Sequence, residues 1–328
     1  MARVRVLFLG GTISMTPDAS AHSGATPRLG SAEILAGLAE RLPGDVEVEG
    51  VDLCRVGSSH LTFDPLLDLA GAARAAAEEG VDGVVVVQGT DSMEESGWFL
   101  DLLWPHRAPV VFTGAMRNPS LPGADGAANL VAALSVAADP AWQDQGVLLL
   151  LNDEVHAARH VAKRHTSSPA AFESPGVGPL GRMLEGRAVP LVRVPRRGAL
   201  PLPDSVPATV PVHLAAVGED PAVLRSLGAV ADGVVVAGFG AGHLKADVAD
   251  AAADLVDRIP VVLASRAGAG SVHTHTYGGA GSEEDLLGRG LVNAGHLAPL
   301  KARVLLALLL GGGADRDAVR AAFAEHGG

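Results

Sequence analysis

The chain has 328 residues, of which 48% are hydrophobic and 19% are charged. This composition is typical of a folded globular protein with one large domain or two ordinary ones, and it argues against disorder. The net charge of −12 disfavours a nucleic-acid partner, because binding to phosphates requires a basic surface. No uninterrupted apolar stretch of about 18 residues occurs, so no segment is expected to span a membrane.

The single cysteine, Cys54, excludes a disulfide within the chain and suits a reducing compartment. The N-terminal apolar run is too short for the core of a signal peptide, and no small-residue cleavage site follows it. We therefore expect a cytoplasmic protein.

The first predicted strand, Val4 to Leu9, ends in Gly10, Gly11 and Thr12. The two glycines let the backbone turn sharply and approach a ligand closely. Thr12 carries the first hydroxyl after them and is a candidate nucleophile if a base activates it. Residues 15–29 are rich in Ala, Ser, Thr, Pro and Gly, which favours a loop that could form a lid.

The central predicted strand is Val84 to Val87, an all-valine run typical of a strand buried on both faces of a parallel sheet. Thr90 and Asp91 follow at its carboxyl end, and the capping-box spacing of Ser92 and Glu95 predicts a helix start beside them. Open α/β sheets bind ligands at such a point, and a helix N-terminus favours an anion such as a substrate carboxylate. For this loop alone, a plain turn with a helix cap explains the residues equally well.

Strand, polar loop and helix recur on both sides of this central strand. A strand at 46–48 leads to Ser58 and Ser59, and strands at 110–112 and 147–151 also end in polar residues. The spacing is typical of a parallel sheet, whose strands present their carboxyl ends at one edge. Five polar strand ends at one edge predict a site.

Six prolines between residues 190 and 211 interrupt any regular element and indicate a stiff linker. We predict an N-terminal α/β catalytic domain over 1–188, a Pro-rich linker over 189–212 and a C-terminal α/β domain over 213–328. The glycines of Gly238-Phe-Gly-Ala-Gly242 resemble a dinucleotide-binding loop only weakly, because His243 occupies the position that requires Gly or Ala.

Several short motifs stand in a fixed order along nearly the whole chain. They are Gly10-Gly-Thr-Ile13, Gly89-Thr-Asp-Ser-Met-Glu-Glu95, Thr113-Gly-Ala-Met-Arg117, Asp125-Gly126 with Asn129, and Asn152-Asp-Glu154 followed by Lys163. Together they resemble the bacterial L-asparaginase family. The resemblance implies a flavodoxin-like parallel sheet in the N-terminal domain, a smaller C-terminal α/β domain and a homodimer or homotetramer. It implies no cofactor and no metal.

The resemblance also implies roles for individual residues. Thr12 resembles the nucleophilic threonine, and Thr90 and Lys163 resemble the second threonine and the lysine of the catalytic group. Asp91 resembles the aspartate that holds the α-amino group of the substrate. Glu283 keeps the spacing of a catalytic glutamate that a neighbouring subunit supplies.

Substrate contacts are implied at a second set of positions. Ser58 resembles the serine that binds the α-carboxylate, Ser59 stands where relatives vary, and the Ala115–Met116 backbone lines the amide-binding end. The full set expected to contact substrate is Gly11, Ser58, Ser59, Gly89, Ala115, Met116 and His243.

The chain departs from the family pattern in its lid. Most relatives use a lid tyrosine to activate the nucleophile, but residues 15–29 contain none, and Tyr277 is the only tyrosine of the chain. The substitutes that we consider for a base are Lys163 acting through Thr90 and a water, His22, and Tyr277. We favour Lys163, because it belongs to an intact motif. His243 also replaces a family asparagine, and Gln88 replaces a histidine.

These features predict an amidohydrolase that cleaves the side-chain amide of L-asparagine through a threonine acyl-enzyme and releases ammonia and L-aspartate. Two alternatives stay open. One is a catalytically weak paralogue that binds an amino acid as a sensor, and the other is an amidohydrolase that prefers glutamine or D-asparagine. The expected partners are a small amino-acid amide and further copies of the chain, without nucleic acid or membrane.

Overall fold

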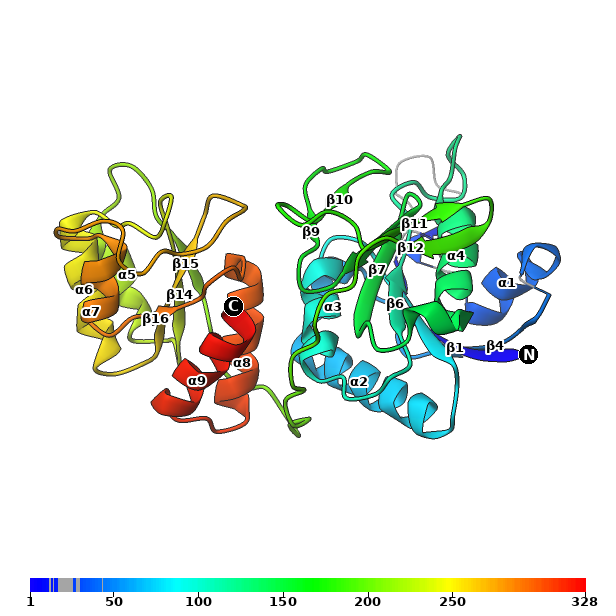
Figure 1. Cartoon of the computed structure of the whole chain (residues 1–328), viewed down its shortest axis with the longest axis horizontal. Coiled ribbons are helices and arrows are strands. Elements are labelled where there is room, and N and C mark those ends of the chain that lie inside the picture. Colours follow the sequence, from blue (N-terminus) through cyan, green and yellow to red (C-terminus); the bar gives the residue numbers. More distant parts are fainter. Residues whose placement is uncertain (12, 14, 17–25, 28–29, 43) are drawn as a thin grey trace. The chain divides into compact units, whose positions relative to one another are not determined.

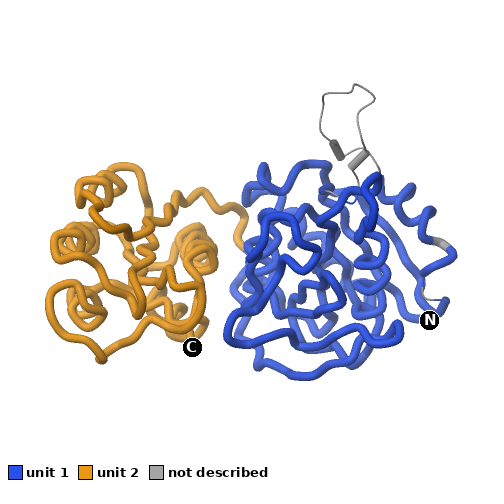
Figure 2. Tube along the Cα trace, turned by 90° about the horizontal axis from the view of Figure 1, so that it is seen from above, with its two compact units in different colours: residues 1–202 blue, residues 203–328 orange. Residues whose placement is uncertain are grey.

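The structure is a computed structural model that describes residues 1–11, 13, 15–16, 26–27, 30–42 and 44–328. The chain forms two compact units, Met1–Leu202 and Pro203–Gly328 (Figure 2). Residues 191–211 contain no helix or strand, and the division between the units falls inside this stretch. The domain boundaries at 188 and 213 stay predictions.

The described residues of unit 1 form one sheet of eight strands, in the order β12-β11-β8-β7-β6-β5-β1-β4 (Figure 1). The strands are β1 (Ala2–Phe8), β4 (Val46–Asp52), β5 (Gly83–Val87), β6 (Val110–Thr113), β7 (Val147–Leu151), β8 (Glu154–Ala157), β11 (Gly181–Leu184) and β12 (Arg187–Pro190). Strands β4, β1, β5, β6 and β7 are parallel. Counted along the chain, their order is 2-1-3-4-5, which is the flavodoxin-like order. The predicted fold class is confirmed.

The helices of unit 1 cover both faces of this sheet. They are α1 (Ser31–Ala36), α2 (Phe63–Glu78), α3 (Met93–Leu102) and α4 (Gly126–Ala138), with 3-10 turns η2 (Ala39–Arg41), η3 (Ser58–His60) and η4 (Pro140–Trp142). Valines 85 and 87 of β5 face a buried cluster with α1 and α4, and valines 84 and 86 alternate to the other face. Helices α2 and α3 pack there and stack Phe63 on Phe99 with ring centroids 5.5 Å apart. This burial explains the uninterrupted apolar run of the central strand.

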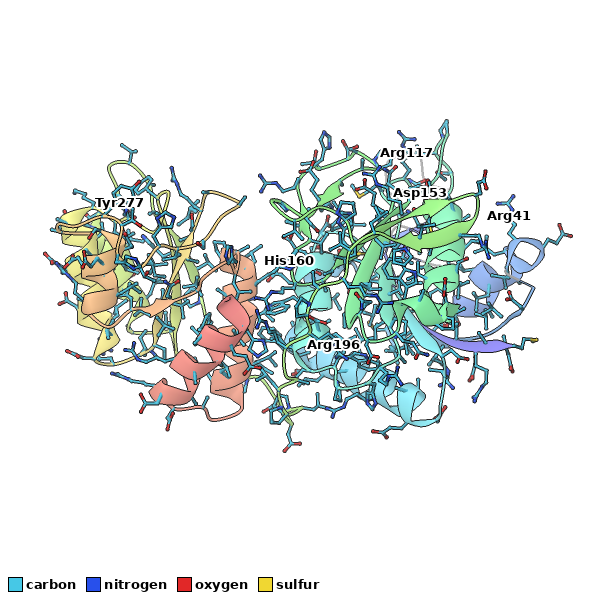
Figure 3. All side chains as sticks on the ribbon, viewed as in Figure 1. Arg41, Arg117, Asp153, His160, Arg196 and Tyr277 are labelled. Atoms are coloured by element: carbon cyan, nitrogen blue, oxygen red, sulfur yellow. The ribbon has the colours of Figure 1, made fainter. Side chains whose placement is uncertain are left out.

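The antiparallel strands β8, β11 and β12 were not predicted from the sequence. Asn152 and Asp153 both have left-handed backbone angles, φ 51° and 63°, so they form a two-residue hairpin turn after β7 (Asp153 is labelled in Figure 3). The polar residues at this strand end therefore turn the chain back instead of leading to a helix. Two short pairs complete unit 1, β2 (Met15–Thr16) with β3 (Thr26–Pro27) and β9 (Ala162–Lys163) with β10 (Phe172–Glu173).

The segment after β12 is tied to unit 1 by Arg196, which is labelled in Figure 3. Its guanidinium donates to the carbonyl of His106 at 2.9 Å and also to the carbonyl of Trp104. Leu200 N donates to the carbonyl of Leu102 at 2.7 Å. These bonds keep the proline-containing segment ordered without regular structure.

Unit 2 is a smaller α/β unit with a parallel sheet in the order β13-β14-β15-β16. Its elements are β13 (Val212–Leu214), α5 (Pro221–Leu227), β14 (Val234–Gly238), α6 (Ala246–Val256), β15 (Val261–Ser265), α7 (Glu283–Gly288), β16 (Val292–Asn293), α8 (Pro299–Gly311) and α9 (Arg316–Gly327). Asp220 caps α5 through Ala222 N, as the Asp-Pro pair at its start predicts. Within the described residues, no helix is long and apolar enough to cross a bilayer.

His156 lies in β8, and its ring is almost fully buried beside the hydroxyl of Ser174, 2.9 Å from Nδ1. Burial, together with the charge of Arg182, lowers the pKa of His156 from 6.5 to about 4. Between these two values the unfolded chain binds a proton on this ring and the folded chain does not. The free energy of unfolding should therefore fall as the pH drops from 6.5 to 4, by roughly 3 kcal/mol in total.

Urea unfolding of the wild type and of His156→Gln at pH 7 and pH 4.5 measures this loss. The variant should lose less stability between the two pH values, whereas the exposed-histidine control His60→Gln should behave as the wild type does. Equal pH dependence in the wild type and His156→Gln would contradict the assignment.

Candidate active site

Two glycine backbones meet where the parallel strand order reverses, at the carboxyl ends of β1 and β5. Gly11 has a φ of +100°, and a Cβ atom built on it would lie 2.2 Å from the backbone nitrogen of Gly89. Only glycine allows this approach. The contact brings the loop after β1 against the loop that carries Thr90 and Asp91, at the point where such folds bind ligands.

Lys163 from β9 joins Thr90 and Asp91. Its Nζ donates to Thr90 Oγ1 at 2.9 Å and to Asp91 Oδ1 at 2.7 Å. Thr90 is buried, whereas the Asp91 side chain is 66% exposed and the Lys163 side chain is 15% exposed. The ammonium group of Lys163 donates hydrogen bonds and accepts none, so it acts as the donor in both contacts.

The Lys163 backbone is held as well, because its N–H donates to Glu94 Oε2 of α3 at 2.8 Å. This bond fixes β9 against the helix that follows the Thr90 loop. A pocket of about 340 Å³ opens beside the bridge and is lined by Asp91, Lys163, Arg164, His165 and Thr166. Neither Glu94 nor His165 was predicted as a site residue, although Glu94 lies within the motif that begins at Gly89.

Ser58 lies on the other side of the Thr90 loop. Its buried hydroxyl oxygen accepts the N–H of Asp91 at 3.1 Å, which leaves the hydroxyl proton to donate elsewhere. Ser92 Oγ donates to the carbonyl of Ser58 at 2.8 Å. Ser59 is exposed, and its hydroxyl lies 3.3 Å from His60 Nδ1.

The predicted capping box at Ser92 is wrong. Ser92 is the N-cap residue of α3, but its side chain makes no capping hydrogen bond, because the hydroxyl ties the helix start to η3 instead. Tertiary contact thus replaces a local cap.

The loop after β6 is arranged by Asp125 and Asn129 at the start of α4. Asp125 accepts the N–H groups of Met116 and Arg117 at 3.0 and 2.9 Å. Asn129 donates to the carbonyl of Gly114 at 2.9 Å, and its Oδ1 accepts Asn152 N at 3.1 Å. The Met116 N–H is therefore already bonded to Asp125, so fewer backbone N–H groups of this loop remain to bind a ligand.

Ala115 is buried against the loop after β1. A Cβ on Gly126 would lie 2.8 Å from Ile13 Cγ1 and 3.2 Å from Ala115 Cβ. Ile13 and Ala115 therefore both lie next to Gly126 at the start of α4. Thr12 itself lies outside the described residues, as does His22. Gly11, Ser58, Gly89, Thr90, Asp91 and Lys163 are thus brought together, with Ala115 and Met116 on the neighbouring loop.

Unit 2 holds the remaining two predicted residues, and they are bonded to each other. His243 Nε2 lies 3.0 Å from Glu283 Oε2. Glu283 Oε1 accepts the N–H groups of Thr276 and Tyr277 at 2.8 and 2.7 Å. The two residues are 40 positions apart, and no spacing rule predicts the bond. Among the described residues, no group of three His, Cys, Asp or Glu side chains is arranged to hold a metal ion.

Residues 3–195 match the family model for the N-terminal domain of asparaginase, and residues 209–323 match that for the glutaminase/asparaginase C-terminal domain. The chain belongs to the asparaginase family. Members of this family are hydrolases that act on amides, and the asparaginase-type amidohydrolase predicted from the motifs is confirmed at this level.

Individual asparaginases are similar over nearly the whole length. L-asparaginase 2 of Escherichia coli is 32% identical over 99% of this chain and 94% of its own. A glutaminase-asparaginase of Pseudomonas aeruginosa is 29% identical over 99% of this chain and 91% of its own. The crystal structure of a probable cytoplasmic L-asparaginase from Campylobacter jejuni superposes with a TM-score of 0.84 at 29% identity, covering 99% of this chain and 100% of that one.

Asn129 should be essential for the stability of the site loops. Asn129→Ala leaves the carbonyl of Gly114 and the N–H of Asn152 without their partner, and the free energy of unfolding should fall by about 2–4 kcal/mol in a urea titration. The matched control is Ser135→Ala in the same helix, whose hydroxyl donates to the helix carbonyl of Val131, and it should change stability by less than about 0.5 kcal/mol. Equal effects would remove Asn129 as the organiser of these loops.

Proposed function

We propose that this chain hydrolyses the side-chain amide of L-asparagine through a threonine acyl-enzyme and releases ammonia and L-aspartate. The observation that carries the proposal is the Lys163 bridge to Thr90 and Asp91 at the carboxyl end of β5. It joins a buried hydroxyl to a cation and an exposed carboxylate that both line the pocket, and the asparaginase relatives support the choice of an amino-acid amide.

The charges of the site fit an amino acid that carries both an ammonium and a carboxylate group. The exposed carboxylate of Asp91 can pair with the α-ammonium group of the substrate. Ser58 can donate its hydroxyl proton to the α-carboxylate, since its oxygen already accepts the Asp91 N–H. These two contacts would leave the side-chain amide as the reacting end.

Thr12 is the proposed nucleophile. Its oxygen attacks the amide carbon, backbone N–H groups hold the oxyanion, and the C–N bond breaks as ammonia leaves. A water then cleaves the ester and releases L-aspartate. Thr90, Asp91 and Lys163 are the other proposed catalytic residues, and Glu283 is proposed to complete this group as a positioning residue. The Lys163 ammonium stabilises negative charge that develops beside Thr90.

An ammonia-release assay with L-asparagine, L-glutamine and D-asparagine tests the function. L-asparagine should give the highest kcat/KM. Glutamine is the main competing candidate, because a similar relative is a glutaminase-asparaginase and one methylene changes binding by only about 1–3 kcal/mol. Binding of an amino acid without ammonia release above background would favour the sensor alternative.

Loss of the reacting groups should abolish turnover without unfolding the chain. Thr12→Ala, Thr90→Ala and Lys163→Met should each lower kcat by several orders of magnitude, because each removes a group that the reaction uses. Thr209→Ala, an exposed threonine, is the matched control and should keep wild-type kcat. Near-normal turnover of Thr12→Ala would remove it as the nucleophile.

We further propose that the active species is a homodimer or homotetramer in which Glu283 and the His243 loop complete the site of a neighbouring copy. Mixing Thr12→Ala subunits with Glu283→Ala subunits should then restore part of the activity that each lacks alone. Some sites of the mixed oligomer combine the intact Thr12 of one chain with the intact Glu283 of the other. Sedimentation at the assay concentration provides the second measurement. A fully active monomer would contradict the shared site.

We also propose a cytoplasmic location. The single cysteine suits a reducing compartment, and the similar Campylobacter jejuni protein is a probable cytoplasmic L-asparaginase. Assay of separated cell fractions tests this.

A further inference from the structure

Unit 2 contains a cluster of four side chains whose individual roles in the proposed reaction are not yet assigned. The His243 cluster consists of His243, Glu283, Tyr277 and His273 (Tyr277 is labelled in Figure 3). Glu283 is its centre and is completely buried at the start of α7. Both carboxylate oxygens are occupied, Oε1 by two backbone N–H groups and Oε2 by the ring of His243.

The carboxylate is ionised. Burial raises the pKa of Glu283, but hydrogen bonds from the backbone N–H groups of Tyr277, Glu283 and Thr276 and from His243 outweigh it and hold the pKa at about 2. A carboxylate can only accept, so the proton of the Glu283–His243 bond lies on Nε2 of the imidazole. In the neutral ring, Nδ1 then carries the free lone pair.

The imidazole ring of His243 is fixed by its neighbours but remains partly exposed. Phe239 and His243 exchange backbone hydrogen bonds of 2.9 and 2.8 Å across a tight turn, which fixes the main chain of His243. Tyr277 packs perpendicular to the imidazole with ring centroids 4.9 Å apart, and the ring of His273 lies parallel to that of Tyr277 with centroids 6.4 Å apart. The His243 side chain is nevertheless 34% exposed, and none of the described residues bonds Nδ1.

A carboxylate that orients an imidazole whose second nitrogen is free is the arrangement of a general base with its positioning group. We propose that His243, positioned by Glu283, is the base that takes the proton of the attacking hydroxyl in the site of a neighbouring copy. This inference rests on the proposed amide hydrolysis and on the proposed sharing of the site.

The step balances without a further reactant. The O–H bond of the nucleophile breaks, its proton moves to His243 Nδ1, and the oxygen forms a bond to the amide carbon. The imidazolium then returns the proton to the leaving nitrogen, the C–N bond breaks and ammonia departs. Glu283 stabilises the imidazolium through the existing Nε2 bond.

Three groups were first considered as the base. His22 lies outside the described residues, and Lys163 and Tyr277 are less suited to this task than His243. Lys163 donates to Thr90 and Asp91 as an ammonium, which has no lone pair until it loses a proton. The phenol of Tyr277 must also lose its proton before it can accept one. The imidazole already has a lone pair in its neutral form.

Replacement by asparagine separates a base from a mere hydrogen-bond partner, because the His243→Asn side chain can still donate to Glu283 but has no basic nitrogen. In the ammonia-release assay, His243→Asn should lower kcat by about 10²–10⁴-fold and change KM by less than about threefold. His275→Asn is the matched control and should keep wild-type kcat and KM. His275 is an exposed histidine of the same loop, and Thr274 is the one described residue that its ring bonds. Tyr277→Phe should cost less than about tenfold.

Chemical rescue provides the second readout. Added imidazole should raise the turnover of His243→Ala at least about tenfold and leave that of Thr90→Ala unchanged, since only the former lacks a base. Full turnover of His243→Asn, or a folded His243→Ala protein that imidazole does not affect, would overturn the inference while leaving amide hydrolysis in place. Absence of amide hydrolysis in the wild type would instead overturn the proposed function.

Discussion

The close approach of the Gly11 and Gly89 backbones is the constraint on which the rest of the site depends. A Cβ atom at Gly11 would lie 2.2 Å from Gly89 N, and one at Gly89 would lie 2.7 Å from Ser58 Oγ. Side chains at either position would therefore push apart the loops after β1 and β5 and displace Ser58. Without them, the strand ends pack closely enough for Ser58 to accept the Asp91 N–H and for Lys163 to reach Thr90.

Two carboxylates illustrate how their surroundings set their roles. Asp91 is 66% exposed, shares one oxygen with Lys163 and is free to meet a substrate cation. Glu283 is completely buried, and two backbone N–H groups and one imidazole use its oxygens, so it can position another group but has no room for a ligand. Burial and hydrogen bonding, rather than residue type, thus distinguish a binding group from a positioning group.

The fold was largely predictable because its central strands are uninterrupted apolar runs and its helix boundaries carry local signals. Val84–Val87 indicated a buried parallel strand, and Asp220 with Pro221 indicated the start of α5. Strands β8, β11 and β12 were missed, since each has four residues and its pairing depends on tight turns such as that at Asn152 and Asp153. Local capping rules also failed at Ser92, whose hydroxyl has a tertiary partner.

The site was predictable in part, and mainly from motif order. Thr90 and Asp91 followed from their place after the central strand, but Lys163 is 72 positions from Asp91 and looks like a surface charge on local spacing alone. The bonds that Glu94, Asn129 and His243 make join distant segments, and no periodicity encodes them. Sequence patterns therefore located the strand ends, whereas the hydrogen-bond partners that give each group its role required the three-dimensional structure.

The central claim is that amide hydrolysis passes through a threonine ester, and intact-mass spectrometry of acid-quenched reactions tests it most directly. Mixing the wild type with L-asparagine should produce a transient adduct whose added mass equals that of asparagine minus ammonia, located on a threonine and absent from Thr12→Ala. Steady release of ammonia with no adduct at any quench time, together with an unaffected Thr12→Ala variant, would contradict the account.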